Sequence, residues 1–148
     1  MIKLKIFVDM DGVLANFEKA AEKYPEVKRP DLVLDFSKFE VIEGAKEAIS
    51  KIEEMGHDVF IASTPPWNNP EAWGQKRNWI DEHFPSLRRK VFLTHRKDLL
   101  SGDILIDDTT YRGQKDFTGT FIHFGKNGMK WDNVVEIIDT ITKLQTQQ

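Results

Sequence analysis

The chain begins with a short apolar run that ends in two acids and a glycine, Ile6-Phe7-Val8-Asp9-Met10-Asp11-Gly12. A second apolar run, Ile104-Leu105-Ile106, ends in a similar way with Asp107 and Asp108. Short unbroken apolar runs are typical of strands that are buried on both faces of a parallel sheet. Because α/β proteins bind their ligands at the carboxyl ends of such strands, we expect the two acidic pairs to meet in one pocket.

Strand-like and helix-like patterns alternate along the rest of the chain. The predicted strands are residues 3–8, 59–62, 91–93, 104–106 and 120–122. The predicted helices are residues 13–24, 45–55, 70–84 and 132–144, with N-caps at Asn69 and Asp132 for the last two. This alternation predicts an α/β fold of the three-layer, Rossmann-like type, in which helices flank a parallel sheet on both sides.

One segment interrupts the alternation. Residues 25–43 contain two prolines and several aromatic residues but no clear period, so we expect a short cap-like insertion there. No linker is visible elsewhere, and the length is that of one ordinary domain, so residues 1–148 are predicted to form a single domain.

Composition narrows the function classes. The net charge of −3 argues against a surface built for nucleic-acid backbone, so no stable nucleic-acid complex is expected. The chain has no cysteine, which excludes thiolate chemistry, and it shows neither a signal peptide nor a membrane span. We therefore expect a cytoplasmic protein, and its oligomeric state, including a homo-oligomer, stays open.

The acidic pairs suggest metal-assisted chemistry. Carboxylates gathered at one site need a counter-charge, and Mg²⁺ prefers such hard oxygen ligands together with water and phosphate. A carboxylate at a strand tip, such as Asp9, can attack phosphorus, and a second one two residues later, Asp11, can transfer protons. The alternative for this tetrapeptide is a turn that merely begins a helix.

Other strand ends add candidates for binding phosphate. Ser63 and Thr64 end the second predicted strand with hydroxyl groups, which suit phosphate oxygens; the alternative is an ordinary N-terminal cap before a helix. Lys97 follows the third strand within a basic run, whose other members are expected to be solvated surface. Trp67 lies in the loop after Thr64 and is a candidate for contacting substrate.

Taken in order, these motifs resemble those of the haloacid dehalogenase (HAD) superfamily of phosphohydrolases. The resemblance is closest to the 5′(3′)-deoxyribonucleotidase group and spans residues 5 to about 110. The first motif is Asp9-Met10-Asp11-Gly12-Val13-Leu14-Ala15-Asn16-Phe17-Glu18. The other three are Ile61-Ala62-Ser63-Thr64-Pro65, Leu93-Thr94-His95-Arg96-Lys97 and Leu105-Ile106-Asp107-Asp108.

The resemblance implies a role for each motif. Asp9 becomes the nucleophile and Asp11 the general acid and base. Ser63, Thr64 and Lys97 become the phosphate-binding residues. The Mg²⁺ site is formed by Asp9, Asp11 (through its backbone carbonyl), Asp107 and Asp108. An aromatic residue shortly after the first motif packs on the nucleobase in such enzymes; here that would be Phe17, for which core packing is the alternative.

The sequence therefore predicts a Mg²⁺-dependent phosphomonoesterase that hydrolyses (deoxy)nucleoside monophosphates through an aspartyl-phosphate. Two alternatives stay open: a related phosphatase for sugar phosphates or nucleic-acid terminal phosphates, and a non-catalytic phosphate-binding or signalling domain. The chain departs from the family in two places. Only residues 25–43 are available for a cap, and Thr109-Thr110-Tyr111-Arg112 stands where the family has Arg-Pro after the acidic pair.

Overall fold

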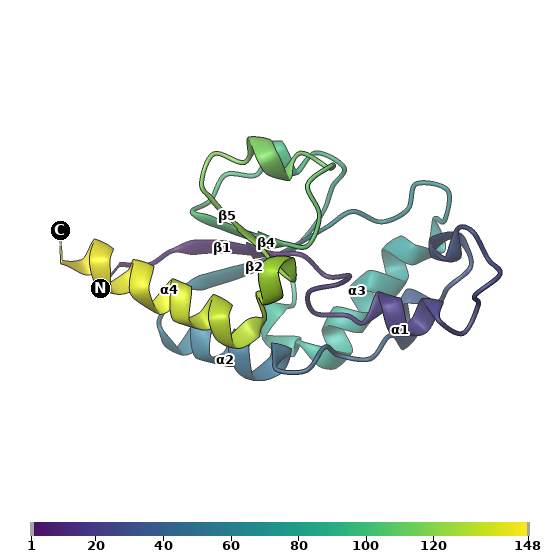
Figure 1. Cartoon of the computed structure of the whole chain (residues 1–148), viewed down its shortest axis with the longest axis horizontal. Helices are drawn as coiled ribbons and strands as arrows, with labels where there is room; N and C mark the ends of the chain where they lie inside the picture. The colour runs from purple at the N-terminus through teal and green to yellow at the C-terminus, as the bar shows by residue number, and fades with distance from the viewer. Residues whose placement is uncertain (1, 148) are drawn as a thin grey trace.

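The protein is built on one five-stranded parallel sheet. The computed structural model describes residues 2–147. Its strands are β1 (Lys5–Val8), β2 (Asp58–Ser63), β3 (Val91–Leu93), β4 (Ile104–Asp107) and β5 (Thr120–His123), in the order β3-β2-β1-β4-β5 (Figure 1). Every neighbouring pair is parallel. The predicted α/β fold is confirmed. From β1 the chain adds β2 and β3 on one side and then β4 and β5 on the other, and open sheets of this kind bind ligands at such a switch point, here between β1 and β4.

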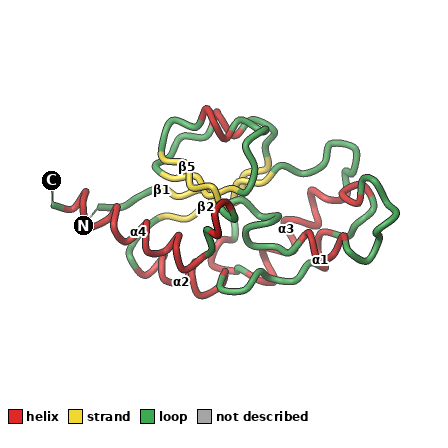
Figure 2. The backbone as a smooth tube through the Cα atoms, in the orientation of Figure 1, coloured by secondary structure: helices red, strands yellow, loops and turns green. Residues whose placement is uncertain are grey.

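The α-helices cover one face of the sheet. They are α1 (Phe17–Ala21), α2 (Ala45–Glu54), α3 (Glu71–His83) and α4 (Trp131–Thr146). Ile6 and Val8 of β1 point into a large core together with apolar residues of α2, α3 and α4. Figure 2 shows these helices gathered on one side of the strands. The burial of one apolar stripe per helix supplies most of the stability of this layer.

The opposite face is covered differently from the expectation. Phe7 of β1 and Leu105 of β4 point into a small core that is closed by Leu100 and Phe117. These two residues lie in the connections before and after β4, which contain only 3₁₀ turns, Lys97–Leu99 and Gln114–Asp116. The connections are too short for an α-helix and its turns, so compact loops replace the helices predicted for this side.

The first helix begins later than predicted. Residues 13 and 14 are fully buried, but they belong to a tight turn in which three successive amides, those of residues 13–15, donate to the Met10 carbonyl. Gly12 has a left-handed φ of 83°, and Asn16 then caps α1 by accepting a hydrogen bond from the Lys19 amide. Apolar spacing indicated burial correctly here, but the glycine turn delays the helix to Phe17.

Both predicted N-caps are wrong. The Asn69 side chain donates to the carbonyl of Asp31 at 3.0 Å instead of capping α3, so it ties the start of α3 to segment 25–43. At α4, Asn133 rather than Asp132 closes the first turn, because its Oδ1 accepts from the Lys130 amide at 2.9 Å. At α3 the predicted residue forms a tertiary contact instead of a cap, and at α4 the residue after the predicted one forms the cap.

Segment 25–43 is irregular, as expected, and lies against α3. It contains two 3₁₀ turns, Pro30–Leu32 and Phe36–Lys38. Trp79 of α3 donates its indole N–H to the carbonyl of Phe39 at 2.8 Å, and the Phe36 amide donates to the Gln75 side chain at 3.0 Å. The segment is therefore fixed to the helical layer beside the carboxyl edge of the sheet. None of the helices described in residues 2–147 has the length and apolarity that crossing a membrane requires.

Candidate active site

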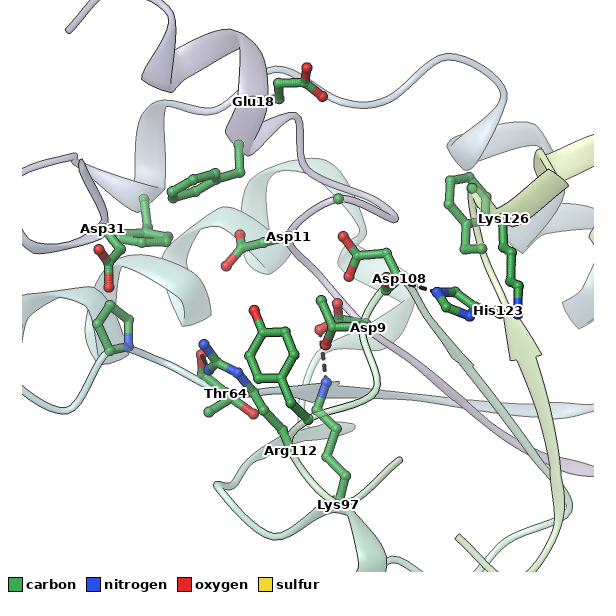
Figure 3. Close-up of a pocket in the computed structure, with 18 of the residues that line it drawn as sticks. Asp9, Asp11, Glu18, Asp31, Thr64, Lys97, Asp108, Arg112, His123 and Lys126 are labelled. Carbon is green, nitrogen blue, oxygen red and sulfur yellow. Dashed lines mark hydrogen bonds and ion pairs between the residues drawn. The ribbon is translucent and has the colours of Figure 1, made fainter. Parts of the chain in front are cut away.

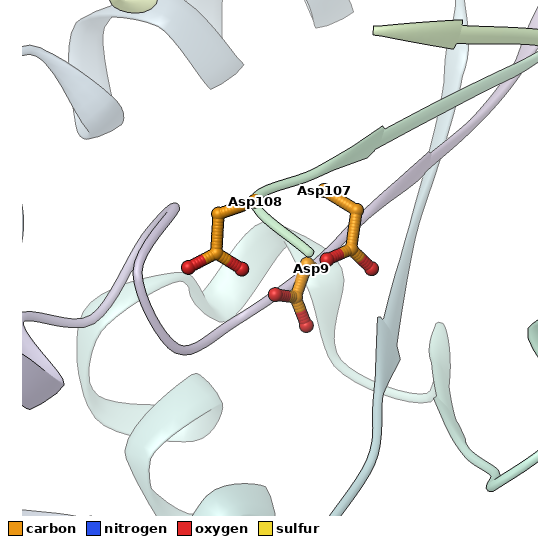
Figure 4. A group of neighbouring side chains, drawn as sticks. All are labelled: Asp9, Asp107 and Asp108. Carbon is orange, nitrogen blue, oxygen red and sulfur yellow. The ribbon is translucent and has the colours of Figure 1, made fainter. Parts of the chain in front are cut away.

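The acidic ends of β1 and β4 meet at one edge of the sheet. Val8 of β1 is paired in register with Ile106 of β4, and the Asp9 amide donates to the Ile106 carbonyl at 2.8 Å. The residues that follow this pair, Asp9 and Asp107, therefore lie side by side. Oxygen atoms of Asp9, Asp107 and Asp108 lie within 4.8 Å of one another (Figure 4). The predicted meeting of the two acidic pairs is confirmed for these three residues.

The cluster carries more negative charge than its surroundings neutralise. Burial, followed by the negative charge of the nearby Asp9 and Asp107, raises the pKa of the Asp108 carboxyl to about 8. Burial, followed by the charge of Asp9, also raises the pKa of Asp107. Carboxyl groups whose pKa values are raised in this way are stabilised by binding a proton or a cation. Three hard oxygen donors at this spacing therefore fit a divalent metal ion.

Lys97 is the buried counter-charge of the cluster. Its Nζ lies 3.0 Å from Asp9 Oδ1 and also donates to Asp107 Oδ2, and the residue is only 1% exposed. Burial alone would lower the pKa of Lys97, but the two carboxylates outweigh burial and raise it. The Lys97 amide donates to the Arg112 carbonyl, so the loop after β4 holds this lysine in place.

Asp11 forms a separate group with a second buried lysine. Lys76 Nζ lies 2.6 Å from Asp11 Oδ2 and 2.8 Å from Ser63 Oγ, and Lys76 is fully buried on α3. The other carboxylate oxygen of Asp11, Oδ1, is buried and accepts no hydrogen bond from the described residues. Asp11 is thus held by one oxygen and keeps the other free.

Lys76 is the main site residue that the sequence reading missed. It stands four residues after Ala72 and four before Ile80, on the stripe of α3 that faces the core. A lysine on an apolar stripe is unusual, because charged side chains are almost never fully buried unless they are paired. That position was the signal, but the acid that pairs with Lys76, Asp11, is not recognisable from helical spacing.

The two hydroxyl residues at the end of β2 lie differently. Ser63 is buried, and its Oγ is held by Lys76, so it lies behind the pocket wall. Thr64 lines the pocket, and its hydroxyl donates to the Thr94 carbonyl at 2.8 Å. Thr64 and Lys97 are therefore the predicted phosphate-binding residues whose side chains border the open space.

These groups surround one large pocket of about 990 Å³. Figure 3 shows Asp9, Asp11 and Asp108 facing its centre, with Lys97 paired to Asp9 and the His123 ring beside the Asp108 carbonyl. The remaining lining residues come from α1, from segment 25–43, from the loop after β4, and from the end of β5 and the loop after it. They include Phe17, Arg29, Asp31, Phe36, Thr109, Tyr111, Arg112, His123 and Lys126.

Comparison with known proteins identifies the family. Residues 23–134 match the family described as 5′ nucleotidase, deoxy (Pyrimidine), cytosolic type C protein. The chain belongs to this 5′ nucleotidase family. The family is part of the HAD superfamily, whose phosphoric monoester hydrolases generally use a divalent metal. The resemblance seen in the four motifs and the predicted enzyme class are therefore confirmed.

Relatives of the 5′ nucleotidase family cover most of the chain. A Vibrio phage KVP40 protein named "Putative 5′(3′)-deoxyribonucleotidase" is 30% identical over 93% of this chain and 86% of its own length. The human 5′(3′)-deoxyribonucleotidase of cytosolic type is 29% identical over 76% and 75%. A mouse protein named "5′(3′)-deoxyribonucleotidase, mitochondrial" is 28% identical over 81% of this chain and 69% of its own length. Relatives thus carry both cytosolic and mitochondrial names, and a cytoplasmic location stays a prediction.

The two aromatic candidates for substrate contact are placed differently in this family member. Phe17 lines the pocket and also packs on Phe36 and Phe39, with ring centroids 6.1 and 5.8 Å away. Phe17 therefore packs in the core and also borders the pocket, and its contact with a nucleobase stays a prediction. Trp67 is 73% exposed and lies outside the pocket lining, where its ring packs on Trp73 and His95.

Proposed function

We propose that this protein is a Mg²⁺-dependent phosphatase of deoxyribonucleoside monophosphates that works through an aspartyl-phosphate on Asp9. The observation that carries the proposal is the position of Asp9. It borders the pocket, it belongs to the three-carboxylate cluster, and one of its oxygens is held by Lys97. The names of the relatives, 5′(3′)-deoxyribonucleotidases, support the substrate class.

Asp9, Asp107 and Asp108 would hold the metal ion. Their mutual distances and the raised pKa values of Asp107 and Asp108 support a cation at this point. The side chain of Asp11 is paired with Lys76, so any contribution of Asp11 is expected through its backbone carbonyl. When bound, Mg²⁺ supplies positive charge that offsets the charge of the phosphate and of the carboxylates.

The first chemical step is proposed for Asp9. Lys97 holds Oδ1, which leaves the other carboxylate oxygen to attack phosphorus. The new bond joins this oxygen to phosphorus, and the bond between phosphorus and the ester oxygen breaks. The positive charge of Lys97 offsets negative charge on Asp9 and on the incoming phosphate, which lowers the repulsion between them.

Asp11 is proposed to move the protons. It lines the pocket, and its Oδ1 has no hydrogen-bond partner in the described chain. Protonated Asp11 gives its proton to the leaving ester oxygen and becomes a carboxylate. It then takes a proton from the water that attacks phosphorus, which breaks the bond to Asp9 and releases inorganic phosphate. Lys76 would stabilise Asp11 as a carboxylate between the two steps.

The pocket offers a place for each part of a nucleotide. Lys97 contacts Asp9 and Thr64 lines the same pocket, and both would face the phosphate (Figure 3). Phe17 is only partly buried and presents aromatic surface on the side of segment 25–43, where a base could stack. The short segment covers this side only, so we propose that it acts as a reduced cap over an otherwise open site.

A substrate panel tests the proposal. Phosphate release from deoxyribonucleoside 5′- and 3′-monophosphates should exceed release from sugar phosphates, and chelation of divalent metal should stop it reversibly. Asp9→Asn should lower kcat by several orders of magnitude, because it removes the nucleophile. The exposed Asp116→Asn is the matched control and should behave as the wild type.

Three results would contradict the proposal. Full activity of the Asp9→Asn enzyme would remove the covalent intermediate. Equal rates on nucleotides and sugar phosphates would favour a general sugar-phosphate enzyme. Absence of release from every ester in the presence of Mg²⁺ would favour the non-catalytic alternative.

A further inference from the structure

An exposed aromatic cluster lies next to the pocket and has no part in the chemistry proposed above. It consists of Trp67, Trp73 and His95, whose ring centroids lie 5.7 to 6.1 Å apart. Trp67 is 73% exposed and His95 is exposed, while Trp73 at the start of α3 is partly buried beneath them. The name "outer aromatic cluster" is used below for these three rings.

The outer aromatic cluster is not part of either core. The other two tryptophans, Trp79 and Trp131, are at most 2% exposed, and each donates its indole N–H to a backbone carbonyl. The Trp67 side chain forms no hydrogen bond with the part of the chain that is described. Its large apolar face is therefore open to solvent, which is unusual for a tryptophan without a ligand or partner.

The cluster adjoins the pocket, and the two loops that carry its exposed rings are hydrogen-bonded to each other. Pro66, directly before Trp67, lines the pocket, as does Thr64. The loop that carries Trp67 is joined to the loop that carries His95, because Thr64 Oγ1 donates to the Thr94 carbonyl and the Thr94 amide donates to the Ser63 carbonyl. A group leaving the pocket past Thr64 and Pro66 would reach Trp67 next.

Positive charge lies on the same side of the pocket. Arg112 lines the pocket, and its guanidinium lies 3.4 Å from the Thr64 carbonyl and 5.3 Å from the centre of the Tyr111 ring. Arg112 forms no ion pair with any carboxylate within residues 2–147, so its charge is available to an anion. Tyr111 beside it is 75% exposed. Sites that bind single-stranded nucleic acid combine exposed aromatic rings, on which bases stack, with positive charge that attracts the phosphates.

We propose that the outer aromatic cluster binds the second base of a phosphorylated dinucleotide or of a short single-stranded end, with Arg112 facing the linking phosphodiester. This inference rests on the proposed function, because the terminal phosphate is the group that would occupy the Asp9 site. It extends the substrate class from mononucleotides to oligonucleotide termini. The internal phosphodiester is only bound, and the same terminal ester bond is hydrolysed.

The test compares two substrates on two tryptophan variants. The substrates are dTMP and dithymidylates that carry one phosphate at the 5′ or the 3′ end. Trp67→Ala should lower kcat/KM for a dithymidylate about tenfold, toward the lower end of base stacking because the ring is exposed, with a several-fold smaller loss on dTMP. Trp67→Phe should restore most of the loss. Leu144→Ala, which truncates an exposed apolar residue near the end of α4, is the control and should change neither substrate.

A binding measurement separates this inference from the proposed function. Dithymidylate should quench the tryptophan fluorescence of the Asp9→Asn protein more than dTMP does, and Trp67→Ala should remove that difference. If the wild type hydrolyses neither substrate, the proposed function fails and the quenching still decides the stacking site. Equal losses on both substrates, no loss on either, or a change of oligomeric state in Trp67→Ala would overturn the inference.

Discussion

Replacing Asp108 with asparagine should stabilise the metal-free protein while removing its response to divalent metal. In the folded protein, burial together with Asp9 and Asp107 raises the pKa of Asp108 to about 8 from an ordinary value of 3.8. A carboxyl whose pKa is raised by folding contributes full stability only below its unfolded pKa, and that contribution is lost as the pH rises through the folded pKa. Asparagine has nearly the same shape and no charge, so it avoids this loss.

The size of the effect follows from the distances in the cluster. At the 4.8 Å limit between carboxylate oxygens, one like-charge pair costs about 3.5 kcal/mol at an effective dielectric constant of about 20. Lys97 offsets part of this repulsion because it contacts Asp9 and Asp107. We expect the free energy of unfolding to rise by about 2 kcal/mol, which corresponds to about 4 to 8 °C in Tm for a chain of this length.

Thermal unfolding at several pH values measures this directly. With a chelator present, the advantage of Asp108→Asn over the wild type should grow as the pH rises from about 4 to about 8 and then stay constant. Adding Mg²⁺ should raise the Tm of the wild type and leave that of Asp108→Asn nearly unchanged. Asp116→Asn is the control. An Asp108→Asn protein that is less stable than the wild type at every pH would refute the reasoning.

Three further changes test other parts of the site and fold. Lys76→Met should lower kcat about 10²-fold with a smaller change in KM, because Asp11 loses its buried partner, whereas the exposed Arg77→Met should not; a larger effect on KM than on kcat would argue against this role. Gly12→Ala should abolish the Mg²⁺-induced rise in Tm, since a Cβ there would lie 2.0 Å from Asp108 Oδ2 at a φ of +83°, and an unchanged rise would contradict the close approach. Burial lowers the pKa of His57 below 6.5, so the stability that its neutral ring contributes is present above that pH and lost below it. In urea unfolding, the difference in the free energy of unfolding between the wild type and His57→Gln should therefore become smaller as the pH falls.

Much of the sheet was predictable from local sequence. Each apolar run that was predicted as a strand is one. For β1 and β4 the reason is burial on both faces, which requires several adjacent apolar residues. The acids at the ends of β1 and β4 were predictable as neighbours, since parallel strands place their carboxyl ends at one edge. The helix beginnings were less predictable. The left-handed turn at Gly12 and the contact between Asn69 and Asp31 involve geometry that residue preferences do not specify.

The chain by itself determined which carboxylates end the buried strands and therefore which groups could share a metal. Only the tertiary structure decided what surrounds them. The pairing of Lys76 with Asp11 depends on the rotation of α3 against the sheet, and the distance of Trp67 from the pocket depends on how two loops are joined. The contacts concerned, Lys76 with Asp11 and Thr64 with Thr94, join segments far apart in the sequence, about which hydrophobic periodicity carries no information. Strand ends are marked by local apolar runs, whereas side-chain partners across layers are fixed by packing.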